Sequence, residues 1–218
     1  MALRAVVMVL RAALAIGLCG GVAYADAKVD WARGLVIADG VGVADRHAPN
    51  PAVARGTSRR GAEEAAKKVI AAKLGDLPLA SGARLADKLK DKAIKARLDA
   101  AIEAAVSLDA EPETDGAWRV TMAVPIEAIR QAVVGVRELP GPGDAGPAVV
   151  VIDSVSVKPA VGWRIGTLDA ATVWTSELPA WAKDAPHVKA TQARAGTIEI
   201  DGGKGTAATV YVIVTAHL

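Results

Sequence analysis

The residue types that perform most metal and acid–base chemistry are scarce in this chain of 218 residues, which has three histidines and one cysteine. His47, His187 and His217 are far apart, so no two have the short spacing with which helices and loops hold a metal ion. Each is solitary in the sequence, in a loop or near the end of the chain. We therefore expect no metal site.

A serine nucleophile needs a base within hydrogen-bonding reach. The chain has no Gly-x-Ser-x-Gly sequence, and Ser154 and Ser156 alternate along a strand-like run that offers no base nearby in the sequence. A triad assembled from distant residues stays open, because geometry and not chain order defines it. From the sequence we expect no catalytic residues and no cofactor.

Three short runs partly match ligand-binding loops. Residues 40–42 begin like a dinucleotide fingerprint, but Asp45 stands where the third glycine is needed. Residues 203–206 break the Gly-Lys-Ser/Thr order of a phosphate loop, and the acidic run 109–115 lacks the ligand order of a calcium loop. We interpret them as a strand end close to another backbone, a hairpin loop and a solvated acidic turn.

Tryptophan is the residue type of interest in the second half, because its large apolar body and polar edge serve both cores and binding surfaces. The chain has no phenylalanine, so a core there needs other aromatic side chains. We expect Trp163 and Trp174 to supply that core. Trp181 follows a Leu-Pro-Ala sequence, and we predict that it is exposed and binds a partner.

The elements that would position these residues begin with a strand at residues 34–43 and a long helix from Pro51 to Leu74. Asn50 is a suitable N-cap, and proline costs no hydrogen bond at the first helical position. Apolar residues recur at helical spacing at Val53, Ala62, Ala65, Ala66, Val69, Ile70 and Leu74. Two ion pairs at four-residue spacing, Glu63 with Lys67 and Glu64 with Lys68, predict a solvated outer face.

A second helix is predicted over residues 80–105. Two strands follow, at residues 106–110 and 118–124, with Asp115 and Gly116 as a turn signal between them. Residues 125–134 predict a short helix. The pattern strand, helix, helix, strand, strand predicts an α+β domain with two helices on a small sheet.

Proline and glycine dominate residues 139–147, which we interpret as a linker. Beyond it, residues 148–157 predict a strand, and residues 197–200 and 206–216 predict a closing hairpin. The expected organisation is a signal peptide at 1–25, an α+β domain at 26–138, the linker at 139–147 and a smaller β-rich domain at 148–218.

The first 25 residues have two arginines, no acid and an uncharged run of 14 residues, which is shorter than the roughly 20 of a spanning helix. We expect signal-peptidase cleavage between Ala25 and Asp26. Cys19 could mark lipid attachment, but Leu18 stands where a small residue is required. Without Arg4 and Arg11, basic and acidic residues are equal in number, which argues against a nucleic-acid partner.

A set of residues in the N-terminal half carries a family resemblance: Trp31, Gly34, Ile37, Ala38, Gly40, Gly42, Pro51, Ala54, Arg55, Ala62, Ala65, Ala66 and Leu74. With these residues the N-terminal half resembles the bacterial envelope lipoproteins typified by a twenty-kilodalton membrane-associated lipoprotein, related to the N-terminal domain of flagellar assembly protein T. Residues 118–125 are similar to that family's last strand, and residues 149–165 and 186–201 to segments that follow it in some relatives. The resemblance thus covers nearly the whole mature chain.

The resemblance implies a non-enzymatic protein of the periplasm or outer membrane, with envelope or flagellar basal-body proteins as partners. Membrane attachment would depend on lipidation of Cys19. The alternative hypothesis is a periplasmic small-ligand binder or hydrolase with a cleft between the two halves, near residues 140–147. A concave pocket with convergent polar groups would favour that alternative.

Overall fold

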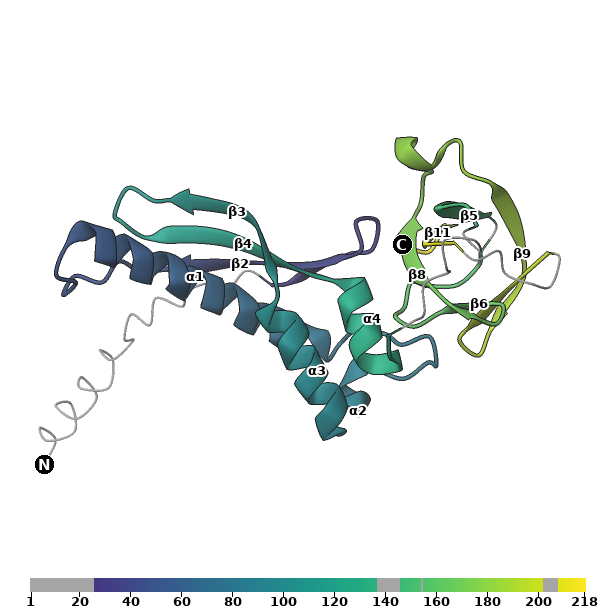
Figure 1. Cartoon of the computed structure of the whole chain (residues 1–218), viewed down its shortest axis with the longest axis horizontal. Coiled ribbons are helices and arrows are strands. Elements are labelled where there is room, and N and C mark those ends of the chain that lie inside the picture. The colour runs from purple at the N-terminus through teal and green to yellow at the C-terminus, as the bar shows by residue number, and fades with distance from the viewer. Residues whose placement is uncertain (1–25, 137–145, 154, 202–207) are drawn as a thin grey trace, which may run out of the picture.

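The fold is α+β, with two sheets (Figure 1). The computed structural model describes residues 26–136, 146–153, 155–201 and 208–218. The expected signal peptide with Cys19 and Ala25 lies outside the described residues, as does most of the predicted linker. The predictions for those segments therefore stay predictions.

The first sheet is antiparallel and has the strand order β1-β2-β4-β3. Its strands are β1 (Lys28–Asp30), β2 (Leu35–Gly42), β3 (Val106–Pro112) and β4 (Trp118–Pro125). The long helix α1 (Pro51–Leu74) runs along one face, and α2 (Leu85–Lys88), α3 (Lys92–Glu103) and α4 (Ile126–Val134) gather near its C-terminal end (Figure 1). β1 was not predicted, because its three residues are too short to show a period.

Helix α1 lies very close to β2, because two glycines face it. A Cβ at Gly40 or Gly42 would collide with the α1 backbone at Ala62 or Ser58. The Ser58 hydroxyl donates to the Gly42 carbonyl at 2.5 Å from a buried position. The interpretation of residues 40–42 as a close backbone approach is confirmed, and the partner backbone belongs to a helix.

The predicted start and end of α1 are confirmed, with the Asn50 side chain accepting from the Val53 backbone N–H. Its buried stripe differs from the prediction at two positions. Val53 is exposed, and Ser58 is buried instead. The buried face of α1 is the face that lies against Gly40 and Gly42 of β2. At this face Ser58 is small enough to fit, and its hydroxyl satisfies the Gly42 carbonyl.

The single helix predicted over residues 80–105 is wrong. Gly82 has a φ of +85°, and the Leu79 N–H donates to the Ala83 carbonyl, so the chain turns before α2 begins. The Asp91 carboxylate then accepts from the Ala93 and Ile94 N–H groups and starts α3 as a separate helix. The apolar spacing continues across residues 80–105, but the Asp91 cap starts a new helix and so divides the segment in two.

The second sheet has seven strands in the order β7-β6-β10-β9-β5-β11-β8 and curves strongly in Figure 1. Its strands are β5 (Val149–Asp153), β6 (Arg164–Ile165), β7 (Leu168–Asp169), β8 (Ala171–Thr175), β9 (His187–Arg194), β10 (Thr197–Ile200) and β11 (Val210–Val214). The predicted closing hairpin is wrong: β10 pairs with β9 and β6, whereas β11 pairs in parallel with β5 and β8.

Aromatic side chains fill the concave core of this second sheet. Trp174 and Tyr211 are buried and Trp163 is 7% exposed, with the two indole rings 6.2 Å apart. Trp181 lies on the short helical turn η1 (Ala180–Ala182) and is 59% exposed. The predicted burial of the first two tryptophans and the exposure of Trp181 are confirmed.

Among the described residues, backbone hydrogen bonds join the two halves of the chain at two places. The Trp174 backbone N–H donates to the Trp31 carbonyl in the turn between β1 and β2, at 3.1 Å. Leu79 forms a parallel bridge with Val161, through Ala80 N–H to Val161 O and Val161 N–H to Pro78 O, both at 2.9 Å. Trp31 also packs against the hydrophobic cores of both sheets.

The edge strand β3 resists pairing with another strand. A bulge interrupts it between Ser107 and Asp109, and Pro112 has no N–H. The Ala110 N–H donates to the Asp109 carboxylate at 2.8 Å. The predicted Asp115-Gly116 turn is confirmed, since Gly116 has a φ of +85° and its N–H donates to the Glu113 carbonyl.

Candidate functional site

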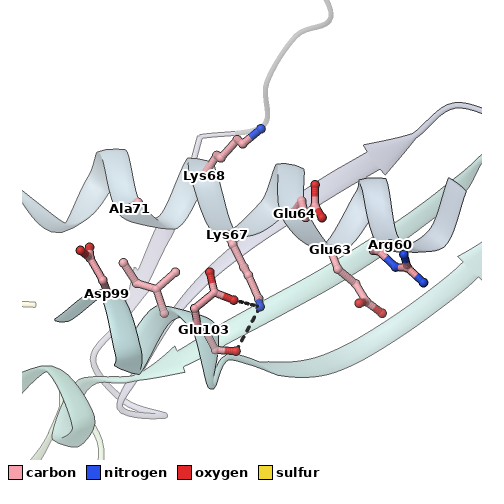
Figure 2. A pocket seen from close by; sticks show the side chains of 9 residues that line it. Arg60, Glu63, Glu64, Lys67, Lys68, Ala71, Asp99 and Glu103 are labelled. Atoms are coloured by element: carbon pink, nitrogen blue, oxygen red, sulfur yellow. Dashed lines mark hydrogen bonds and ion pairs between the residues drawn. The ribbon is translucent and has the colours of Figure 1, made fainter. Parts of the chain in front are cut away.

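A groove of about 470 Å³ runs between α1 and α3 (Figure 2). It forms because α3 covers only part of α1 before the chain turns into β3 (Figure 1). Seven of its nine lining residues are charged, and Ala71 and Ile102 provide the apolar surface. The lining residues are Arg60, Glu63, Glu64, Lys67, Lys68, Ala71, Asp99, Ile102 and Glu103.

Lys67 connects the two walls of the groove. Its ammonium donates to the Glu103 carboxylate at 2.8 Å and to the Glu103 carbonyl at 3.0 Å (Figure 2). The acceptors lie at the C-terminal end of α3, where backbone carbonyls lack helical partners and favour a cation. This contact links the C-terminal end of α3 to α1.

Both predicted ion pairs along α1 are wrong. Glu63 pairs with Arg59 at 3.2 Å, and Lys67 pairs with Glu103 on α3. Between Glu64 and Lys68 the structure has no ion pair. The end of α3 offers Lys67 two acceptors, which a single carboxylate one turn away on the same helix cannot match.

Three charges on the rim have no ion-pair partner within the described part of the chain: Arg60, Glu64 and Lys68. They recur every four residues, so they form one ridge along α1 with alternating charge, and all three side chains are exposed. Asp99 on the facing wall is held by Lys95 at 2.6 Å. On the α3 side of the groove, Asp99 and Glu103 are held in ion pairs. On the α1 side, the ridge of Arg60, Glu64 and Lys68 has no ion-pair partner among the described residues.

The groove is suited to binding by charge and shape. Its lining consists of lysine, arginine, aspartate and glutamate side chains with Ala71 and Ile102, and contains no histidine, cysteine, serine, threonine or tyrosine. Across the described residues, no group of three or more histidine, cysteine, aspartate or glutamate side chains is placed to hold a metal ion. In the same part of the chain, no helix combines the length and apolar character needed to cross a bilayer.

The other residues that the sequence predicted as sites lie away from the groove. Trp181 is on η1, beside a small apolar cluster of Val151, Ala182 and Val212. The acidic run 109–115 is on β3 and its turn, where Glu113 pairs with Arg119 at 3.0 Å. His187 is not solitary: it begins β9 and contacts Asp153 on β5, because parallel pairing brings together residues distant in the sequence.

A smaller pocket of about 280 Å³ lies where the two halves meet. Leu79, Val133, Val134 and Val161 supply apolar side chains, and Ser81 and Lys88 contribute to a lining that is about as polar as it is apolar. This is the location that the small-ligand hypothesis requires, although residues 137–145 of the predicted cleft lie outside the described residues.

No protein-family model matches this chain, and no curated protein matches it either. The groove was also not found from the sequence, where the charges of α1 were interpreted as a solvated face. No feature of the sequence indicated the groove, because Glu63 and Glu64 follow Arg60 within one turn and such a run of charges is typical of a solvated helix face.

Proposed function

We propose that this chain is a secreted, non-enzymatic component of the bacterial cell envelope that binds a protein partner through the groove between α1 and α3. The observation that carries the proposal is the ridge of Arg60, Glu64 and Lys68, exposed beside a groove whose opposite wall is fixed by Lys67 and Glu103. Free charges beside an ordered groove give a partner both orientation and register.

Several other features support this proposal. The N-terminal segment has the composition of a signal peptide, and the residues quoted above resemble the envelope lipoprotein family. Under the proposal, residues 26–138 and 148–218 are two domains, with the helices of the first presenting the groove. The partners are envelope proteins, among which flagellar basal-body proteins are one group.

The test is capture of partners from the periplasm with a matched pair of charge-swapped variants. The tagged chain is crosslinked in cells, and the bound proteins are identified by mass spectrometry against a tag-only control. The groove variant carries Glu64→Lys with Lys68→Glu, which preserves net charge and costs less than about 0.5 kcal/mol of helix stability. The control variant carries Lys158→Glu with Glu199→Lys, two exposed residues of the C-terminal half.

The proposal predicts that the wild-type and control chains recover the same envelope proteins, and that the groove variant recovers about tenfold less of them. Thermal unfolding of the three purified proteins shows that they are equally folded. Equal recovery by the groove variant, or recovery of no envelope protein by the wild-type chain, would overturn the proposal.

The small-ligand alternative has one observation in its favour, the pocket between the two halves. A pocket that combines aliphatic side chains with the Lys88 ammonium and other polar groups would suit a small carboxylate with an apolar tail. Titration of the purified chain with octanoate, followed by the amide spectra of Leu79 and Val161, tests it. Shifts that vanish in a Lys88→Met variant would support the alternative, and unchanged spectra would remove it.

A further inference from the structure

Apart from the groove, the structure pairs one imidazole with one carboxylate. His187 Nδ1 lies 2.7 Å from Asp153 Oδ2, and the side chains are 43% and 37% exposed. His187 is at the start of β9 and Asp153 at the end of β5, two adjacent parallel strands. The sheet therefore holds both backbones in place, and the two side chains meet at the surface.

The contact determines which ring nitrogen of the neutral imidazole is reactive. An ionised carboxylate can only accept a hydrogen bond, so Nδ1 carries the proton and donates to Asp153. The lone pair of the ring is then on Nε2, the nitrogen that Asp153 does not bind. Nε2 of the half-exposed His187 side chain is thus the nucleophilic nitrogen, and the Asp153 carboxylate binds the opposite nitrogen, Nδ1.

A free cation lies beside the pair. Lys189 is opposite Asp153 in the parallel register, and side chains two residues apart on β9 share a face of the sheet. Lys189 is exposed and forms no ion pair with any described residue. A cation near the imidazole attracts an anionic group to the nitrogen that is to be modified.

We propose that His187 is a phosphoryl-acceptor site, with Asp153 as its positioning residue and Lys189 as the cation that attracts the phosphoryl group. The donor class is a small phosphoryl compound with a good leaving group. This inference is independent of the groove, and the two stand or fall separately.

The step balances with phosphoramidate as the donor. The Nε2 lone pair attacks phosphorus, the Nε2–P bond forms, and the P–N bond breaks as its electron pair leaves with ammonia. The ring gains a positive charge, which the Asp153 carboxylate stabilises until the Nδ1 proton passes to water. No oxidation or reduction takes place.

The same chain contains two control histidines. His47 and His217 are also exposed, and neither ring has a carboxylate partner within the described residues. Their backbone N–H groups bond to Asp45 and Thr215, which leaves the imidazoles without orientation from an acid. Differences among the three histidines therefore report the effect of Asp153 and Lys189.

The experiment incubates the purified mature chain with phosphoramidate and follows each histidine peptide by mass spectrometry over time. Phosphorus NMR identifies the modified nitrogen. We expect His187 to react about three- to fivefold faster than His47 and His217, the gain available to a half-exposed charged contact, and to react at Nε2. The Lys189→Met variant should lose part of this advantage.

The Asp153 variants separate a positioning role from a merely structural one. Asp153→Asn should lower the His187 rate to that of the other two histidines and add product at Nδ1, whereas Asp153→Glu should restore Nε2 selectivity. Circular dichroism of each variant checks the fold. Equal rates at all three histidines, modification at Nδ1 of His187 in the wild-type chain, or an unchanged Asp153→Asn variant would overturn the proposal.

Discussion

The two halves of the molecule solve the packing problem in opposite ways. In the first half, α1 reaches the sheet through Gly40 and Gly42, and backbone lies against backbone. In the second half, Trp163, Trp174 and Tyr211 fill the space inside a curved sheet with large rings. The comparison shows two ways to build a core without phenylalanine: glycines that let backbones pack closely, or a few large aromatic side chains gathered in one place.

This difference predicts opposite sensitivities: the first half should not tolerate added atoms, and the second should not tolerate removed ones. The largest effect is expected at Trp174, which is fully buried. Trp174→Ala should lower the free energy of unfolding by about 4 kcal/mol, through lost burial and the cavity left behind. Urea denaturation measures this free energy. If Trp174→Ala loses less stability than Trp174→Phe, which keeps an aromatic ring, the account is contradicted.

The next effect tests the glycine contact. Gly42→Ala places a methyl group against the Ser58 carbonyl, so α1 must move away from β2, at a cost of about 3 kcal/mol. Gly56→Ala, on α1 itself, is the control, because a Cβ at Gly56 meets nothing within 4 Å. It should stabilise the protein by about 0.5 to 1 kcal/mol. Similar effects at both glycines would show that α1 is not held by close approach.

A smaller effect is expected at Ser58, whose hydroxyl bonds the Gly42 carbonyl. Ser58→Ala keeps the close packing and leaves one buried acceptor with one bond fewer, which should cost about 1 to 2 kcal/mol. Thermal unfolding of this variant beside Thr57→Ala, on the exposed side of α1, measures the difference. If Ser58→Ala is no less stable than Thr57→Ala, the hydrogen bond from Ser58 to Gly42 contributes nothing to stability and only the close packing matters.

The smallest effect is expected at Trp163. Its indole N–H is buried and has no hydrogen-bond partner among the described residues. Trp163→Phe removes that unsatisfied donor, which offsets part of the cost of the smaller ring, so the loss of stability should be only about 1 kcal/mol. A loss as large as that for Trp174→Ala would contradict this offset.

The sequence predicted the first half better than the second for a physical reason. Strand β2, helix α1 and the Asp115-Gly116 turn depend on residues a few positions apart, and periodicity and capping report such contacts directly. In the second half, β11 lies between β5 and β8, and no local pattern indicates this parallel pairing. The closing hairpin was predicted because neighbouring strands in a sequence usually pair.

The candidate site was beyond sequence prediction for the same reason. The groove depends on Lys67 reaching the end of α3, 36 positions away, and helical spacing favoured a partner on α1 itself. The His187 and Asp153 pair depends on parallel strands separated by 34 positions. Exposure of Trp181 was predictable, because a proline and small residues precede it on a short turn.

The proposed partner-binding groove lies in the first half, and the exposed Trp181 lies in the second. The most direct measurement replaces Lys68 or Trp181 by a photo-crosslinking amino acid in the tagged chain, irradiates cells and identifies the captured proteins. The account predicts a discrete envelope protein crosslinked from position 68 and not from position 181. Capture from position 181 alone, or from neither position, would contradict it.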